Sequence, residues 1–154
     1  MSIWKTNESQ TSGTQTSTTS RPLDLLHLDL MGPTRMESLG GKSYIMILVD
    51  DFTRYTWVIP LWSKFDASEH IETLCTRLQN EKSLKNDQIQ SDHGKEFENS
   101  YMESFCTRSG ISQEFSTPIT SHLISMEEII LLYHLAPPIQ LIKRDIMVLD
   151  GFHY

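Results

Sequence analysis

The order of the hydrophobic patterns along this chain constrains its fold more than any other feature. Apolar and polar residues alternate with period two over Leu26–Leu30, which indicates a strand with one packed face. His27 and Asp29 share the polar face of that strand. An apolar run at Tyr44–Val49 and a β-branched and aromatic run at Tyr55–Trp62 flank a polar turn. These two runs predict a hairpin.

Two helical patterns and two short strand patterns follow the hairpin. The first helix has the spacing of a capping box at Asp66–Glu69, and its apolar face comprises Ile71, Leu74, Cys75 and Leu78. The second helix is expected to end at Gly110, and its apolar stripe comprises Phe97, Tyr101, Met102, Phe105 and Cys106. Short strands are expected at Gln88–Ser91 and Ile111–Phe115. The resulting order predicts an α/β domain in which helices pack on a mixed sheet.

Length and charge limit the classes of function. A chain of 154 residues corresponds to about one domain with one core. Residues 1–20 are rich in Ser and Thr, so we expect a disordered lead before a domain over residues 21–120. The formal net charge of −7 opposes simple electrostatic binding of nucleic acid. Any role on DNA must therefore depend on a specific site.

The cysteine and hydrophobicity patterns indicate a soluble, intracellular chain. Cys75 and Cys106 both lie in apolar helical patterns, which favours buried reduced thiols over a disulfide or a metal pair. No stretch approaches the roughly 20 apolar residues that a membrane-spanning helix needs, so we expect no membrane partner. Four aromatic residues are expected to pack in the core rather than stack on bases, namely Phe52, Tyr55, Trp57 and Trp62.

Two aspartates close strand-like segments and are the candidate metal ligands. Asp29 lies near the end of the first strand, and Asp92 directly follows the Gln88–Ser91 strand. Phosphoryl transfer by two metal ions needs carboxylates that converge on ions about 3.5–4 Å apart. Neighbouring strands can bring two such acids together, although a solvated turn also explains SDHGKEF. Asp50 and Asp51 fit a turn pair that caps the hairpin better than they fit a metal site.

Three runs carry a resemblance to a known family: SRPLDLLHLDLMGP, ESLGGKSYIMILVDDFTRYTWV and IQSDHGKEFENSYMESFCTRSGISQEFSTP. From about Ser20 to Pro118 the chain resembles the integrase catalytic core of copia-type retrotransposon polyproteins. The resemblance implies a ribonuclease H-like fold and an Asp, Asp, Glu triad that uses Mg²⁺ or Mn²⁺ in a two-metal site. It implies DNA partners, both element ends and target DNA, and it allows a homo-oligomer. A functional member is expected in the nucleus.

The family motifs assign the first two acids. The first acid matches Asp29 in HLDLMGP, and the second matches Asp92 in SDHGKEF. Gly94 would let the backbone turn closely beside Asp92, and Glu96 would be a supporting or structural acid. The family commonly has Arg at the position of His93 and Gly after Gly94. His93 is then either an exposed turn residue without a role or a contact to phosphate.

The third acid is the point at which the chain departs from the family. Glu128 stands 36 positions after Asp92, which is the family's separation. However, residues 121–127 lack the polar Pro-Gln-Gln-Asn-Gly segment. Read in a shifted frame, their codons can encode Thr-Pro-His-Gln-His-Gly, which resembles it. We therefore expect a frameshifted, non-family tail over residues 121–154 and a fold that is incomplete at the C-terminus.

Three hypotheses follow for function. The first is a catalytic core that cleaves and joins DNA strands with Asp29, Asp92 and Glu128 as metal ligands. The second is a degenerate element fragment that binds nucleic acid weakly and catalyses nothing. The third is a domesticated interaction module that uses the sheet surface and the apolar tail. No cysteine precedes Cys75, so the zinc module that usually lies upstream is not expected here.

Overall fold

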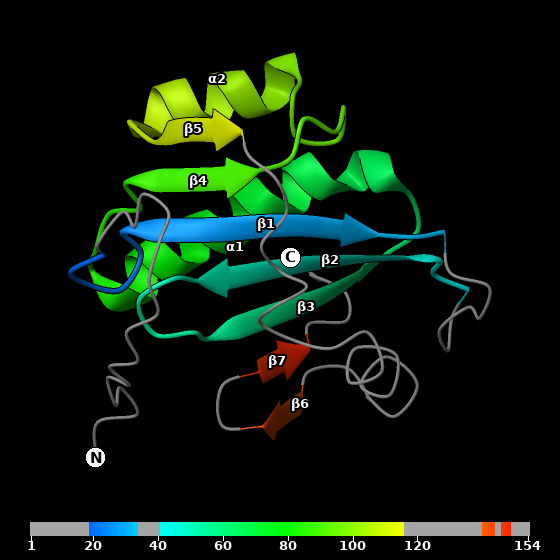
Figure 1. The fold of residues 1–154 in the computed structure, drawn as a ribbon, viewed down its shortest axis with the longest axis horizontal. Helices are drawn as coiled ribbons and strands as arrows, with labels where there is room; N and C mark the ends of the chain where they lie inside the picture. Colours follow the sequence, from blue (N-terminus) through cyan, green and yellow to red (C-terminus); the bar gives the residue numbers. More distant parts are fainter. Residues whose placement is uncertain (1–18, 34–40, 116–139, 144–145, 149–154) are drawn as a thin grey trace, which may run out of the picture.

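The computed structural model describes residues 19–33, 41–115, 140–143 and 146–148, and a mixed β-sheet is its framework. The strands lie in the order β5-β4-β1-β2-β3-β7-β6 (Figure 1). Their bounds are β1 Leu25–Met31, β2 Tyr44–Asp50, β3 Thr56–Leu61, β4 Gln88–Ser91, β5 Ser112–Phe115, β6 Gln140–Lys143 and β7 Ile146–Val148. The predicted α/β class with a mixed sheet is confirmed.

The sheet combines an antiparallel half with a parallel half. β1, β2 and β3 pair antiparallel in sequence order, so the predicted hairpin is confirmed, with Val49 level with Thr56. β4 then pairs parallel with β1, and β5 pairs parallel with β4. In the central strand β2, every residue from Ile45 to Asp50 is buried. Residues that point to either face of β2 are thus buried, which agrees with its unbroken apolar run.

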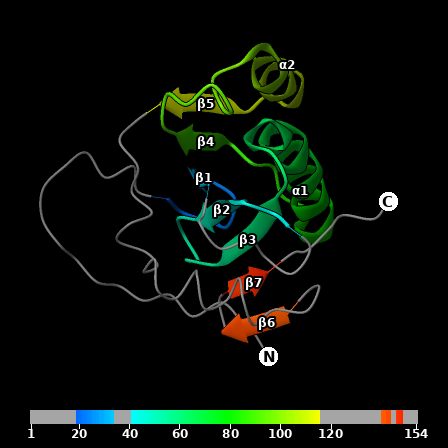
Figure 2. The ribbon, with the colours of Figure 1, turned by 90° about the vertical axis from the view of Figure 1, so that its right-hand side faces the viewer.

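The two helices lie on one face of the sheet (Figure 2). α1 spans Ala67–Lys82 and α2 spans Ser100–Ser109. The core lies between these helices and the strands, and its fully buried large side chains include Leu26, Met46, Leu48, Ile59, Ile71, Leu74, Ile89, Phe97 and Phe105. All four residues predicted for the apolar face of the first helix are buried, which confirms that prediction.

The ends of the helices follow local side-chain chemistry. The predicted capping box at Asp66–Glu69 is wrong, because Asp66 makes no side-chain cap to α1. The box lies one turn earlier: Asp66 Oδ2 accepts from the backbone N–H of Ser63 at 3.1 Å and closes the short 3₁₀ helix η1, Lys64–Asp66. Asn99 caps α2 by accepting from Met102 N–H at 3.0 Å. Gly110 ends α2 with φ +68°, as predicted.

Two exposed aromatic side chains depart from the sequence prediction. Trp62 is 61 % exposed because β3 ends at Leu61, one residue before it. Tyr101 is 47 % exposed, and its hydroxyl donates to Glu72 Oε2 at 2.5 Å. This bond, with partial burial, raises the pKa of Tyr101 to about 12. By contrast, Trp57 is buried as expected.

The two cysteines are buried and form no disulfide, as predicted. Burial raises the pKa of the Cys75 thiol to about 12 and that of Cys106 to about 11. The described helices include none that is both long and apolar enough to cross a bilayer. Residues 116–139, which contain Glu128, lie outside the described residues, as does most of the predicted lead.

Candidate active site

Asp29 lies near the end of β1, and Asp92 directly follows the neighbouring strand β4. β1 and β4 pair parallel, from Leu25 opposite Gln88 to His27 opposite Gln90. Continued by two residues, this register sets Asp29 level with Asp92, and adjacent strands are about 4.8 Å apart. Figure 1 shows the two strands side by side, ending toward the same edge. The expectation that neighbouring strands bring the two acids together therefore agrees with the topology.

Local backbone bonds orient both carboxylates. Asp29 Oδ1 accepts from the N–H of Leu30 at 2.9 Å. Asp92 Oδ1 accepts from the N–H of Gly94, also at 2.9 Å. Both aspartates are half-buried. Each carboxylate is thus held by its own strand end while it remains within reach of solvent.

Gly94 allows a third carboxylate to approach Asp92. A Cβ built on Gly94 would lie 2.3 Å from Glu96 Oε1 and 2.9 Å from Asp92 Oδ1. Real Cβ atoms essentially never show such distances, so a side chain at position 94 would force these two carboxylates to shift. The side chain of Glu96 folds back over the glycine toward Asp92. The sequence left the role of Glu96 open. Its position two residues after Gly94 does not reveal that its side chain folds back toward Asp92.

The donor set fits a hard divalent cation in part. Carboxylate oxygens suit Mg²⁺ and Mn²⁺, and Mg²⁺ is commonly held by one or two carboxylates together with substrate phosphates and water. Within residues 19–33, 41–115, 140–143 and 146–148, no group of three or more His, Cys, Asp and Glu side chains forms a metal-binding cluster. A cation held by Asp29 and Asp92 would take its remaining ligands from substrate, from water or from a further acid.

Asp50 belongs to the hairpin and not to this pair. Its carboxylate accepts from the N–H of Leu23 at 3.0 Å and from the N–H and hydroxyl of Thr53 at 3.0 and 2.5 Å. Burial raises the pKa of Asp50 above its ordinary value, against these bonds. The predicted capping role of Asp50 in the turn is confirmed.

The side chain of Asp51 is hydrogen-bonded to His27, a contact that the sequence did not reveal. His27 shares its strand face with Asp29, yet it is only 5 % exposed. Its Nε2 lies 2.8 Å from Asp51 Oδ1. Burial would raise the pKa of Asp51, but hydrogen bonds from His27 and Thr19 outweigh it and hold the pKa below its ordinary value. The partners are far apart in sequence, so no local pattern signals the pair.

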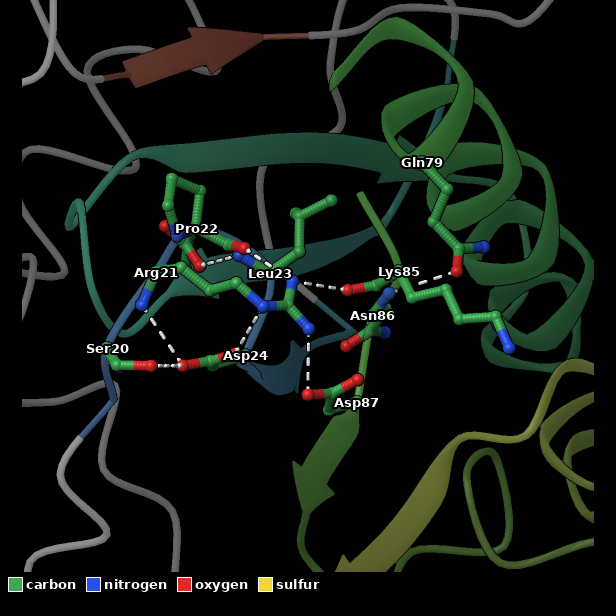
Figure 3. A network of polar contacts seen from close by, with 10 residues as sticks. Ser20, Arg21, Pro22, Leu23, Asp24, Gln79, Lys85, Asn86 and Asp87 are labelled. Atoms are coloured by element: carbon green, nitrogen blue, oxygen red, sulfur yellow. Dashed lines mark hydrogen bonds and ion pairs between the residues drawn. The ribbon is translucent and has the colours of Figure 1, made fainter. Parts of the chain in front are cut away.

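A polar network fixes the start of β1 against the segment that leads into β4 (Figure 3). The guanidinium of Arg21 donates to the carbonyl of Lys85 at 2.8 Å and pairs with Asp87 at 2.8 Å. It also pairs with Asp24 at 3.1 Å. The N–H of Asp87 donates to the carbonyl of Leu23 at 3.1 Å. These bonds join the start of β1 to the segment before β4 and so support the register of the two strands.

His93, the residue after Asp92, is exposed, and its imidazole ring lies against the ring of Phe115. The His93 ring stacks on Phe115, with centroids 4.9 Å apart. Its Nδ1 lies 3.1 Å from Glu98 Oε2. His93 is an exposed residue, as both of the sequence interpretations required.

Comparison with known proteins agrees with this geometry. The family model described as Integrase core domain matches residues 19–121. The chain is 32 % identical over 98 residues to the Retrovirus-related Pol polyprotein from transposon TNT 1-94 of Nicotiana tabacum; the match covers 64 % of this chain and 7 % of that protein. The mixed sheet with its two helices fits the ribonuclease H-like architecture expected for such a core. The chain belongs to the integrase core domain family.

Proposed function

We propose that this chain is the part of a retrotransposon integrase that binds a divalent cation and carries out metal-dependent phosphoryl transfer on DNA, by cleaving and joining strands. The observation that carries the proposal is the parallel β1–β4 register, which runs to His27 opposite Gln90, so that Asp29 and Asp92 each follow the last pair by two residues. Two carboxylates in this arrangement are the protein share of the ligands that Mg²⁺ or Mn²⁺ uses when phosphate supplies the rest.

Each residue of the site has a separate task in this proposal. Asp29 and Asp92 would hold the cation, and the bound cation would supply Lewis acidity at a phosphate oxygen. The N–H of Gly94 orients the Asp92 carboxylate. Glu96 adds negative charge beside Asp92 and so favours a cation there. Glu128 remains the predicted third acid of the triad.

DNA, as element ends and as target, is the proposed partner. The net charge of −7 means that long-range attraction to phosphate is weak. A divalent cation held between the two aspartates cancels their negative charge, so binding of DNA should depend on the divalent ion. Binding that is equally strong in a chelator would contradict this view.

An inactive core is the second candidate. It is favoured by the departure from the family pattern after Thr120. A core with two of its three acids would still bind a cation weakly, but it would not complete the neutralisation that strand transfer requires. The two candidates therefore predict the same metal binding and different chemistry.

The deciding experiment separates metal binding from catalysis. Binding of Mn²⁺ would be followed by electron paramagnetic resonance for the wild type, Asp29→Asn, Asp92→Asn and Glu128→Gln, and strand transfer would be measured on labelled element-end DNA. Glu103→Gln is the control, because Glu103 is an exposed acid on α2. Loss of Mn²⁺ binding in both aspartate variants supports the site, and strand transfer that needs all three acids supports the full activity.

Other outcomes assign the remaining possibilities. Mn²⁺ binding without strand transfer identifies the chain as an inactive core. Strand transfer that survives Glu128→Gln excludes that residue from the triad. Mn²⁺ binding that is unchanged in Asp29→Asn and Asp92→Asn would overturn the proposed site itself.

A further inference from the structure

A pair of stacked rings lies beside Asp92. The ring centroids of His93 and Phe115 are 4.9 Å apart, and the ring planes are inclined by 22°. His93 directly follows Asp92, and Phe115 is the last residue of β5, level with Ser91 of β4. The ring pair therefore lies at the edge of the sheet where the candidate metal ligands lie.

The His93 ring is held in position and is open to solvent. Its Nδ1 lies 3.1 Å from Glu98 Oε2, and 71 % of its side chain is exposed. Phe115 is half-buried and covers one face of the imidazole. The opposite face of the imidazole is then available to a further flat group, which would extend the stack.

The charges around the rings favour a neutral flat ligand over a phosphate. Glu98 bonds the imidazole, Asp92 precedes it in the chain, and the Glu96 carboxylate folds toward Asp92. Three carboxylates in this neighbourhood repel a phosphate that approaches without a cation. A nucleobase carries no net charge, and bases that are not paired stack on His and Phe rings.

We propose that His93 and Phe115 form a stacking platform for one unpaired nucleobase of the DNA that approaches Asp92. The proposal rests on the proposed function, because it takes DNA as the substrate. It goes further by naming the part of the substrate that is bound, a base of a single-stranded or frayed end, and the two residues that bind it. The platform would place that nucleotide next to the candidate metal ligands.

The test follows a single base by fluorescence. A duplex with a short 3′ overhang would carry 2-aminopurine in the overhang, and its quenching would be titrated with the full chain in Ca²⁺. Stacking quenches this base, and His93→Ala or Phe115→Leu should weaken binding of the overhang roughly fivefold to a hundredfold. An abasic overhang should bind the wild type as weakly as the normal overhang binds His93→Ala.

The control variant is Phe65→Leu. Phe65 is 72 % exposed in η1. Phe65→Leu makes the same chemical change as Phe115→Leu at a place outside the platform. This variant should bind the overhang like the wild type. His93→Ala should also keep wild-type Mn²⁺ binding, since His93 is not among the proposed ligands. Thermal denaturation of each variant identifies any loss that comes from unfolding.

Three results would overturn the platform, and they are distinguishable. Wild-type affinity and quenching in both platform variants overturn the platform alone. A loss in His93→Ala without a loss in Phe115→Leu, together with a smaller salt dependence, assigns a phosphate contact in place of stacking. A wild-type chain that binds no DNA overturns the platform together with the proposed function.

Discussion

At the scale of single residues, a substitution at Gly94 should change the affinity for metal without changing the stability of the fold. In Gly94→Ala the new Cβ would meet Glu96 Oε1 and Asp92 Oδ1, which are the ends of movable side chains. We expect the two carboxylates to shift and Mn²⁺ affinity to fall about tenfold, while the free energy of unfolding changes by less than about 1 kcal/mol. A Mn²⁺ titration and a urea denaturation check this. Gly94→Ala combined with Glu96→Ala should recover part of the affinity, and a large loss of stability without loss of affinity would contradict it.

Asp51 should make stability depend on pH. Its folded pKa lies below the ordinary value of 3.8, so its contribution is present above that pH and is lost as pH falls through the folded pKa. Asp51→Asn is expected to cost about 1–3 kcal/mol at pH 7, because charged hydrogen bonds from His27 and Thr19 are lost. The cost should shrink toward pH 3. Chemical denaturation at both pH values tests this, with Glu103→Gln as the exposed-acid control; a cost that grows on acidification would refute it.

At the scale of elements, the end of α2 isolates a backbone effect. Gly110 has φ +68°, and a Cβ there would meet nothing within 4 Å. Gly110→Ala should therefore destabilise by about 1 kcal/mol through the left-handed conformation alone. Gly110→Asn should cost less, because Asn adopts this conformation more readily. Equal stability of Gly, Ala and Asn in urea denaturation would mean that α2 ends differently in solution.

Elements were predictable where the deciding contacts are local. The hairpin follows from the turn at Asp50, and the end of α2 follows from Gly110. The capping box was placed one turn too late. Ser63 with Asp66 and Asp66 with Glu69 both have the spacing of a capping box, but only Ser63 and Asp66 form one. Trp62 was placed in the core because its run is apolar, whereas its strand ends one residue earlier.

At the scale of the whole molecule, contacts between distant segments decide the site. The sequence identifies Asp29 and Asp92 as strand-end acids, but their common level depends on the parallel register of β1 and β4. That register is supported by bonds such as Arg21 to Asp87, which join segments 66 positions apart. The His27–Asp51 pair and the ring pair beside Asp92 arise in the same way. No periodicity encodes such pairs, so only the folded chain reveals them.

Thiol labelling can test whether a cation bound at Asp29 and Asp92 stabilises the folded chain. Cys75 and Cys106 are buried with pKa values raised to about 12 and 11, so both should be protonated and unreactive at pH 8 until the core opens. A cation that binds only the folded state stabilises it by about 2.7 kcal/mol at a hundred times its Kd. Saturating Mg²⁺ should therefore slow labelling by up to about a hundredfold when reclosing outpaces labelling. Asp92→Asn should remove this protection and leave the rate without Mg²⁺ nearly unchanged. Labelling that Mg²⁺ does not slow in the wild type, although both thiols react fully in urea, would mean that folding of the core is not linked to a metal at Asp29 and Asp92.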